Sequence, residues 1–552
     1  MISEIVTFDG GLSTKTSPHL IQRNQGIICQ NVNLESGVLK PYNSFSFISN
    51  KIGKHIYLYN ENLISSQAET DDRFYETYGS RLYWTDKSHA GANGLRRWDG
   101  TDVGTDATAP DPYDQVNAPV TAVATNDYGQ LTSDAIYTYA LTVTDTDGVE
   151  SAPVFLEPVS LTSSQSQIKL KVNASKVSTY LPTGYTVNIY RQGGDNPTFN
   201  LVIENMNPTH PDVETDGTDL WWLDSVADIN VTRIELTTFE HTSPPDGLDM
   251  LVENQGTFWG AVGRKVFFSQ TGSPEYWGLL DYIQLDKEVT GLGKFGENIV
   301  AFTRTSAYLI SGFNRDNVVS TRLPFNQGCT SKHSVVNVDA YLLWTSLNGI
   351  CIFNGSTIEV ITKKSLSWDE FGRVGNTTYN DFENTTAKWN SGLGFDIKYA
   401  VGYQDRYYGV YNDGIMVIDL SEGIKVSTIE APNVATVAIN EDDNLLYITV
   451  VLEDGTYDVY TLLNTSSYMT ATWKTGRLHD GSVNVRKHYR QVELDGEPVS
   501  VSVYVDGVLK YTSEGKSKFM LPAGLIGRDI QFEINTINEI RSLKYQFSTL
   551  QA

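Results

Sequence analysis

The residues of this chain best suited to metal or nucleophilic chemistry are eight histidines and three cysteines, and their spacing predicts neither function. The histidines occur singly, without an HxxxH or HExxH pair: His19, His55, His89, His210, His241, His333, His479 and His488. We therefore expect each one to be a surface residue or a hydrogen-bonded core residue. The cysteines show no CxxC motif and no metal-ligand spacing, which predicts buried free thiols at Cys29, Cys329 and Cys351.

Other catalytic and ligand-binding signatures are equally weak. The sequence has no GxSxG nucleophile elbow, no P-loop and no GxGxxG that follows a strand. Asp145, Asp147 and Glu150 offer oxygen ligands for calcium, but the other ligands of a 12-residue calcium loop are missing, so a plain hairpin turn is favoured. The same holds for Asp442 and Asp443. We predict no catalytic residue, no metal site and no cofactor, and hence no enzyme.

Tryptophans could stack on sugar rings. The candidates are Trp221, Trp222, Trp259 and Trp277, for which packing in a core or an interface is the favoured interpretation. The Ser-x-Asp-x-Gly-x-x-Trp boxes of sialidases are absent. Paired carboxylates of a glycosidase cannot be recognised among 66 acidic residues.

A recurring turn indicates the elements that would position any such residues. NGLRRWDG begins at Asn93 and NGICIFNG at Asn348, and related turns follow at Asp413 and Asp454. Looser copies of the turn lie before Asn348, at Gly263 and Ser306. The second residues of the turns recur about every 42 residues, with one longer step. They are Gly263, Ser306, Gly349, Gly414 and Gly455. A hairpin in each unit of this length is typical of the blades of a β-propeller. A polar insertion at residues 365–392 accounts for the longer step.

Composition agrees with a β protein of several domains. The chain has 552 residues, of which 40% are hydrophobic, and it carries 31 tyrosines and 10 tryptophans. We predict an all-β fold: a β-propeller of about six blades, an inserted immunoglobulin- or fibronectin-III-like β-sandwich, and a C-terminal β-sandwich.

The boundaries follow from changes of pattern along the chain. Residues 1–116 hold N-terminal strands and the first propeller blade or blades, and one N-terminal strand is expected to complete a distant blade. Residues 117–230 alternate strictly, as in YTYALTVTDTDGVESAP, and resemble fibronectin type III and immunoglobulin-like modules. Residues 231–467 carry the regular repeat. Residues 468–552 form five strand-like runs, with a hairpin turn at Asp506-Gly507.

Charge and targeting signals limit the function classes. The net charge of −25 argues against ordinary nucleic-acid binding, although an acidic wall would let a passing duplex slide without sticking. A soluble acidic surface explains the charge without any DNA. MISEIVTFDGG predicts no signal peptide, and no run approaches the ~18 apolar residues of a membrane span.

Both ends of the chain resemble tail proteins of bacteriophages. FDGGLSTKTSPHLIQRNQGIICQNVNLESGVLKPYN is similar to their N-terminal phrase, and TWKTGRLH, VSVSVYVDGVLKYTS and FMLPAGLIGRDIQFEI are similar to their closing β-domain. LLWTSLNGICIFNG fits their propeller. The family that the chain resembles is the tail nozzle, or tail-tube, protein of short-tailed phages.

This resemblance implies a structural protein of the virion, made in the host cytoplasm. It implies a hexameric ring of identical subunits below a head–tail adaptor protein, with tail fibres or spikes as further partners. Genomic double-stranded DNA would pass through the lumen without sequence-specific binding. Within the insertion, Trp368, Phe371 and Trp389 are candidates for a gate or an inter-subunit loop, and a plain surface loop is the alternative.

Two other function classes remain open at this point. A glycan-binding receptor-recognition or adhesion propeller would use the sandwich and exposed aromatic residues, and a glycan array would reveal it. A propeller hydrolase would lose turnover when one carboxylate is changed.

Overall fold

The computed structural model describes residues 1–550 apart from 16, 36, 69–71, 87–93, 174–180, 207–211, 216–217, 367–396, 412–413, 441–444, 463–465 and 482–483. Within this part the protein is all-β, as predicted, with strands β1 to β47. Its helical segments are α2 (Thr362–Ser365) and the 3₁₀ turns η1 (Asp228–Asn230) and η2 (Lys332–Ser334). No helix in the described ranges has the length and apolar character needed to cross a bilayer.

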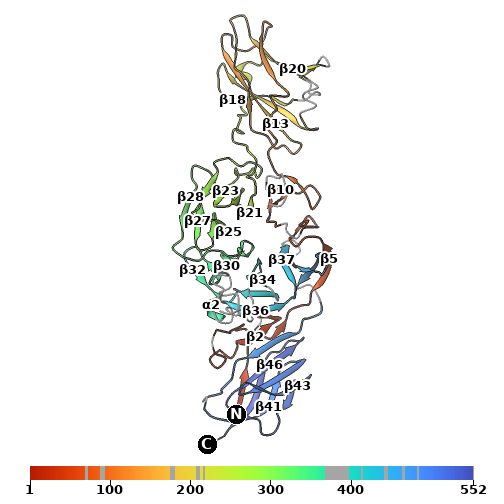
Figure 1. Ribbon diagram of the computed structural model, residues 1–552, viewed down its shortest axis with the longest axis vertical. Helices are drawn as coiled ribbons and strands as arrows, with labels where there is room; N and C mark the ends of the chain where they lie inside the picture. Colours follow the sequence, from red (N-terminus) through yellow and green to blue (C-terminus); the bar gives the residue numbers. More distant parts are fainter. Residues whose placement is uncertain are drawn as a thin grey trace.

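The middle of the molecule consists of small antiparallel sheets whose strands follow one another in sequence (Figure 1). Three of them are β21 (Asp249–Asn254), β22 (Thr257–Val262), β23 (Lys265–Phe268) and β24 (Tyr282–Gln284); β25 (Val289–Phe295), β26 (Asn298–Thr303), β27 (Ala307–Ser311) and β28 (Val319–Arg322); β29 (Val336–Val338), β30 (Tyr341–Ser346), β31 (Gly349–Phe353) and β32 (Ile358–Val360). The others are β8 (Tyr75–Tyr78), β9 (Arg81–Thr85), β10 (Leu95–Arg97) and β11 (Thr105–Asp106); β33 (Tyr399–Tyr403), β34 (Arg406–Tyr411), β35 (Gly414–Asp419) and β36 (Lys425–Glu430); and the hairpin β6 (Ile56–Tyr59) and β7 (Asn62–Ser65).

The turn that recurs in the sequence has the same place in five of the small sheets. Gly263, Ser306, Gly349, Gly414 and Gly455 all lie at the reversal between the second and third strands. Gly263 has a φ of +58°, a left-handed conformation that suits glycine at a tight reversal. The period near 42 residues is therefore the distance from one sheet to the next.

One sheet is completed by a strand from the beginning of the chain. β37 (Val434–Asn440), β38 (Leu445–Val451) and β39 (Tyr457–Leu462) follow one another, and β5 (Ser46–Lys51) pairs with β39 as the fourth strand. The expectation that an N-terminal strand completes a distant sheet is thus confirmed. This pairing protects an edge that would otherwise expose unpaired backbone groups.

Two further sheets enclose a core of their own between β11 and β21. Along the second strand of this region, Tyr137, Tyr139, Leu141 and Val143 are all buried, as their alternation predicts. One sheet contains β12 (Thr121–Thr125), β16 (Gln167–Asn173), β20 (Asp219–Asp224) and β19 (Glu214–Thr215). The other contains β14 (Val154–Phe155), β13 (Ile136–Thr144), β17 (Thr186–Gly193) and β18 (Asn196–Met206), with β15 (Val159–Ser160) beside β13.

The C-terminal region shares a sheet with the middle of the molecule. Nine strands run in the order β33, β34, β35, β36, β2 (Gly26–Gln30), β40 (Ala471–Thr475), β46 (Ile530–Thr536), β42 (Ser500–Val505) and β43 (Val508–Glu514). A second sheet packs beside it, with β1 (Ile2–Ile5), β47 (Leu543–Thr549), β41 (Lys487–Leu494), β44 (Lys518–Met520) and β45 (Ile526–Gly527). β3 (Val32–Asn33) and β4 (Lys40–Pro41) form a small hairpin.

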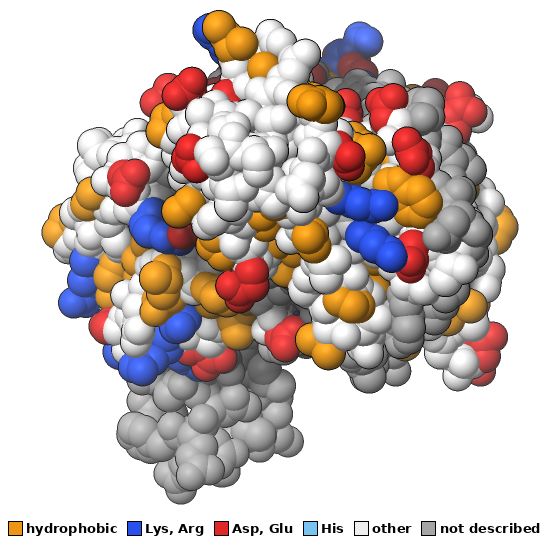
Figure 2. All heavy atoms as spheres, turned by 90° about the horizontal axis from the view of Figure 1, so that it is seen from above, with side chains coloured by type: hydrophobic (Ala, Val, Ile, Leu, Met, Phe, Trp, Pro, Cys, Tyr) orange, Lys and Arg blue, Asp and Glu red, His pale blue; other side chains and the backbone are white. Residues whose placement is uncertain are grey.

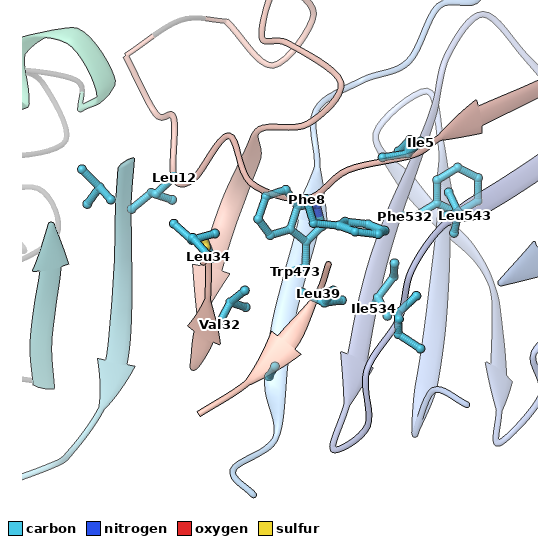
Figure 3. Packing of buried hydrophobic residues seen from close by; sticks show 14 of the residues in the cluster. Ile5, Phe8, Leu12, Val32, Leu34, Leu39, Trp473, Phe532, Ile534 and Leu543 are labelled. Atoms are coloured by element: carbon cyan, nitrogen blue, oxygen red, sulfur yellow. The ribbon is translucent and has the colours of Figure 1, made fainter. Parts of the chain in front are cut away.

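Apolar side chains fill the junction where β2 joins the two regions. Phe8 meets the ring of Trp473 edge-on, with 5.7 Å between centroids, and Leu12, Val32 and Leu34 pack nearby (Figure 3). The buried cluster extends without interruption from the β33–β36 strands into the C-terminal sheets. The N-terminal segment is thus an integral part of the C-terminal core.

These parts lie along one long axis. The sheets that hold β13 and β18 form one end, the small sheets form the middle, and both chain termini lie at the other end (Figure 1). The molecule is therefore elongated, with β-structure along its whole length.

Candidate functional site

A cavity of about 290 Å³ lies where the first strands of the small sheets converge. Its wall draws on seven chain segments, which belong to β6, β8, β21, β25, the η2–β29 segment, β33 and β37. Neighbouring first strands contact one another in the order β6, β37, β33, β29, β25, β21 and β8. The stacked rings of Tyr57 in β6 and Tyr75 in β8, 5.3 Å apart, connect the two ends of this series, so the first strands line the cavity as a ring.

Polar residues gather at the end of this cavity where the first strands begin. His55 directly precedes β6, Asp72 lies three residues before β8, and Asp249 is the first residue of β21. Lys332 and His333 belong to η2, just before β29. Because first strands around a common axis all start at the same face, residues that precede them collect there even when they are distant in sequence.

η2 extends across this end of the cavity. His333 precedes β29 and Phe74 precedes β8, and β25 and β21 lie between these two strands in the order of contacts. The rings of His333 and Phe74 nevertheless stack, with 4.0 Å between their centroids and 10° between their planes. The ring of His333 also lies 5.0 Å from that of His55 and 4.8 Å from that of Tyr399. The turn therefore fills the end of the cavity with packed rings.

The carboxylate of Asp72 is the centre of the polar network. Its Oδ1 lies 2.5 Å from Nε2 of His333 and 3.2 Å from Nε2 of His55. Its Oδ2 pairs with Nζ of Lys332 at 2.5 Å, and the same ammonium donates to both oxygens of Asp249 at 2.7 and 2.8 Å. Two imidazoles thus converge on one oxygen while a lysine holds the other.

The surroundings set the charge of these groups. Burial alone would raise the pKa of Asp72, but hydrogen bonds from His333 and His55 and the charge of Lys332 outweigh it and hold this pKa well below its usual range. Burial lowers the pKa of His333 to about 4 against the opposing effect of Asp72. At neutral pH the carboxylate is ionised and the His333 ring is neutral.

The carboxyl group of Glu76, in β8, lines the cavity. Burial raises the pKa of Glu76 to about 7, opposed by Lys294 and assisted by the like charge of Glu253. Glu76 is therefore a group that titrates near neutral pH on the cavity wall.

Another group of ligand-type residues lies where the N-terminal segment meets the C-terminal region. His19 Nδ1 and His479 Nε2 are 2.8 Å apart, their rings stack, and a carboxylate oxygen of the buried Asp529 is close to both. His19 is exposed, and Arg477 lies 3.4 Å from its Nε2. The site is shallow and flanked by a cation.

The residues singled out from the sequence fall in several places. The prediction of buried free thiols is confirmed for all three cysteines. Trp222, Trp259 and Trp277 are buried in cores, so packing is their role. Trp221 is partly buried and lies beneath Nζ of Lys169 at 4.2 Å.

The acidic turn after β13 is a hairpin turn, as favoured. Asp145 accepts hydrogen bonds from the backbone of Asp147 and Val149, while the carboxylate of Glu150 binds Thr142, Asn188 and Tyr190. The side chain of Asp147 pairs with Arg97. Asp442, Asp443 and the candidate gate residues Trp368, Phe371 and Trp389 lie outside the described residues.

Sequence reasoning missed the grouping of His55, Asp72 and His333. No local motif marks it, because 261 residues separate Asp72 from His333. The available signal was their common position just before the first strand of a repeat unit, which becomes visible only after the units are aligned on their turns.

Comparisons with known proteins find distant structural neighbours only. No protein-family model matches the chain, and no curated protein matches it. Among solved structures, the computationally designed Ika8 protein shares 9% identity over 79% of this chain and 99% of its own, with a TM-score of 0.31. BBS1N in complex with ARL6DN shares 9% identity over 78% of this chain and all of its own, with a TM-score of 0.29.

The WD40 domain of Neurospora crassa Pan2 is a further neighbour, at 8% identity over 55% of this chain and 87% of its own, with a TM-score of 0.27. At such low identities and TM-scores no activity, ligand or partner of these proteins extends to this chain.

Proposed function

We propose that this protein is a structural subunit of a phage tail, a nozzle or tail-tube protein whose ring forms a DNA conduit below the head–tail adaptor. The observation that carries this proposal is the nine-stranded sheet that unites the small sheets with the C-terminal region. A conduit that holds a genome and passes it at ejection needs subunits that transmit load without bending at a linker. The pairing of β2 with β36 at Gln30 and Thr428, together with one continuous core across the junction, supplies that rigidity.

In this proposal the small sheets are the blades of a propeller. Five of these blades have four strands that follow one another in sequence, and a sixth gains its fourth strand from β5. This supports about six blades. The β6–β7 hairpin lies in a further sector of the ring. Residues 117–230 are an inserted sandwich at one end of the rod, and residues 468–552 are a C-terminal sandwich at the other.

The conduit would lie between subunits. η2 fills one end of the propeller cavity, and a volume of about 290 Å³ is far too small for a duplex. The net charge of −25 would give the walls of an inter-subunit lumen a repulsive character toward phosphate. On the end of the rod that holds β13 and β18, acidic, basic and apolar side chains are interspersed, so the negative charge is not gathered there (Figure 2).

Apolar side chains on the C-terminal sheets support contacts between subunits. Val508 and Leu509 lie at the start of the edge strand β43, and Met520 and Ile526 belong to the other sheet. Each of these residues exposes 40% or more of its surface. Burial of such residues in a head-to-tail contact would close a ring.

Mass photometry of the protein, alone and with purified head–tail adaptor rings, tests the proposal. We expect a species six times the 61.4 kDa of the chain, formed or strengthened by the adaptor. Leu509→Glu with Met520→Glu should abolish this species and leave the thermal transition unchanged. Tyr128→Glu, a change at a fully exposed position in the β12–β20 region, serves as the control. A persistent monomer with every adaptor would contradict the proposal and turn attention to a glycan array.

A further inference from the structure

We propose that His55, Asp72 and His333 form a binding site for a divalent transition metal ion at the end of the central cavity. The ligand atoms would be Nε2 of each histidine and Oδ1 of Asp72. These three atoms lie within 4.8 Å of one another and come from three separate segments of the chain. Two imidazoles and one carboxylate are a donor set that suits zinc, cobalt or iron(II).

The distances are close to those of a metal site. Ligand atoms 2.0–2.1 Å from a tetrahedral zinc ion lie about 3.3 Å from one another. The separation of His55 Nε2 and Asp72 Oδ1 is already 3.2 Å. The separation of His333 Nε2 and Asp72 Oδ1 is 2.5 Å, so the imidazole of His333 must move back by less than 1 Å.

The surroundings hold these ligands in the orientation that a metal needs. Lys332 binds Oδ2 of Asp72, which directs Oδ1 toward the two histidines. Asp249 also pairs with Lys332 and offsets its positive charge. The ammonium therefore repels a bound cation less. Phe74 stacks on the His333 ring, and Tyr399 packs edge-on against the ring of His55 at 5.3 Å. Such outer contacts fix the rotamers of ligating side chains.

The ion would bind η2 to the opposite side of the cavity. His333 reaches across from the segment before β29, while His55 and Asp72 precede β6 and β8. Metal binding would thus crosslink three sheets at the axis and stabilise the closed arrangement by mass action. The fourth coordination position would be left to water from the cavity, whose wall adjoins both histidines.

Calorimetric titration of the full chain with zinc chloride tests this site. The His19→Ala background removes the second, shallow cluster as a competing site. In this background we expect one zinc ion per chain. His333→Gln and His55→Gln each remove one of three direct ligands, so each should weaken zinc binding by at least the roughly 10–100-fold that loss of an outer-shell partner costs.

Thermal unfolding without and with zinc separates ligand loss from misfolding. The parent should gain thermal stability with zinc, whereas a folded His333→Gln or His55→Gln variant should not. Asp72→Asn provides a third, nearly isosteric variant if either histidine change prevents folding. The proposal is overturned if the His19→Ala protein takes up no zinc, or if the folded variants bind it with unchanged affinity and stoichiometry.

Discussion

Arg191 is fully buried in the β12–β20 region, where its guanidinium pairs with two carboxylates. It lies 2.7 Å from Asp224 and 3.0 Å from Asp228, and both acids are also buried. Removal of the cation leaves two buried charges without their partner. We expect Arg191→Met to lower the free energy of unfolding by about 3–5 kcal/mol.

Urea denaturation measures this loss. Arg315→Met is the matched control, because Arg315 also pairs with two acids, Glu240 and Asp281, but at the surface, where the expected loss is about 1 kcal/mol or less. Equal losses for both variants would show that burial does not set the strength of the Arg191 network.

Glu76 should make stability depend on pH. Its pKa is raised to about 7 in the folded protein, above the ordinary value near 4.5, so between these values the folded state holds a proton that the unfolded state has released. The free energy of unfolding therefore falls as the pH rises through this window. Glu76→Gln should remove that dependence and raise stability at pH 8 by about 3 kcal/mol, with little change at pH 4.

Denaturation midpoints at pH 4, 6 and 8 check this prediction. Glu240→Gln, a change at an exposed carboxylate, should leave the dependence of the parent intact. The interpretation of Glu76 fails if Glu76→Gln shows the same slope as the parent protein.

At the scale of elements, Gly11 determines how closely the N-terminal segment approaches β36. Gly11 has a φ of +69°, and a Cβ there would lie 2.9 Å from both the backbone nitrogen and oxygen of Val426. Its neighbour Leu12 donates a hydrogen bond to the same Val426 oxygen at 2.7 Å. Gly11→Ala should therefore separate this segment from the sheet and lower the free energy of unfolding by about 2–4 kcal/mol.

Gly37→Ala is the control for backbone strain alone. Gly37 has almost the same φ, +71°, but open space where the Cβ would be, so a loss of about 1 kcal/mol is expected. Thermal unfolding and limited proteolysis between the middle and C-terminal regions would compare the two variants. If both variants lose the same free energy of unfolding, the close approach of Gly11 to β36 adds nothing to the cost of the Gly11→Ala change.

Local sequence patterns predicted many of the strands and turns, but few of the pairings between strands that are distant in sequence. Alternation at Tyr137 to Val143 and the turns at Gly263 and Gly349 depend on neighbouring residues, so the sequence reveals them. The parallel contact of β2 with β36, at Gln30 and Thr428, joins residues almost 400 positions apart and leaves no local trace. The grouping of His55 with His333 was missed for the same reason.

At the scale of the whole molecule, the acidic charge should keep free subunits from binding DNA. Neutralisation of phosphates requires clustered cations, and the chain has 41 basic residues against 66 acidic ones. We expect no measurable binding of a fluorescent duplex by anisotropy at about 0.15 M salt. Tight binding that weakens steeply with salt would contradict a repelling conduit.

The pairing of early strands with late ones also governs when the protein can finish folding during its synthesis. β5 finds its partner in β39, and β1 finds its partner in β47, whose last residue is Thr549. At about 5–20 residues per second, the ribosome needs roughly half a minute to two minutes to deliver those partners. The strands β12 to β20, whose partners all lie within one stretch of chain, can fold much earlier. A nascent chain halted midway would thus carry the two folded sheets of the β12–β20 region beside small sheets that are still incomplete, because β1 and β5 would not yet have met their partner strands.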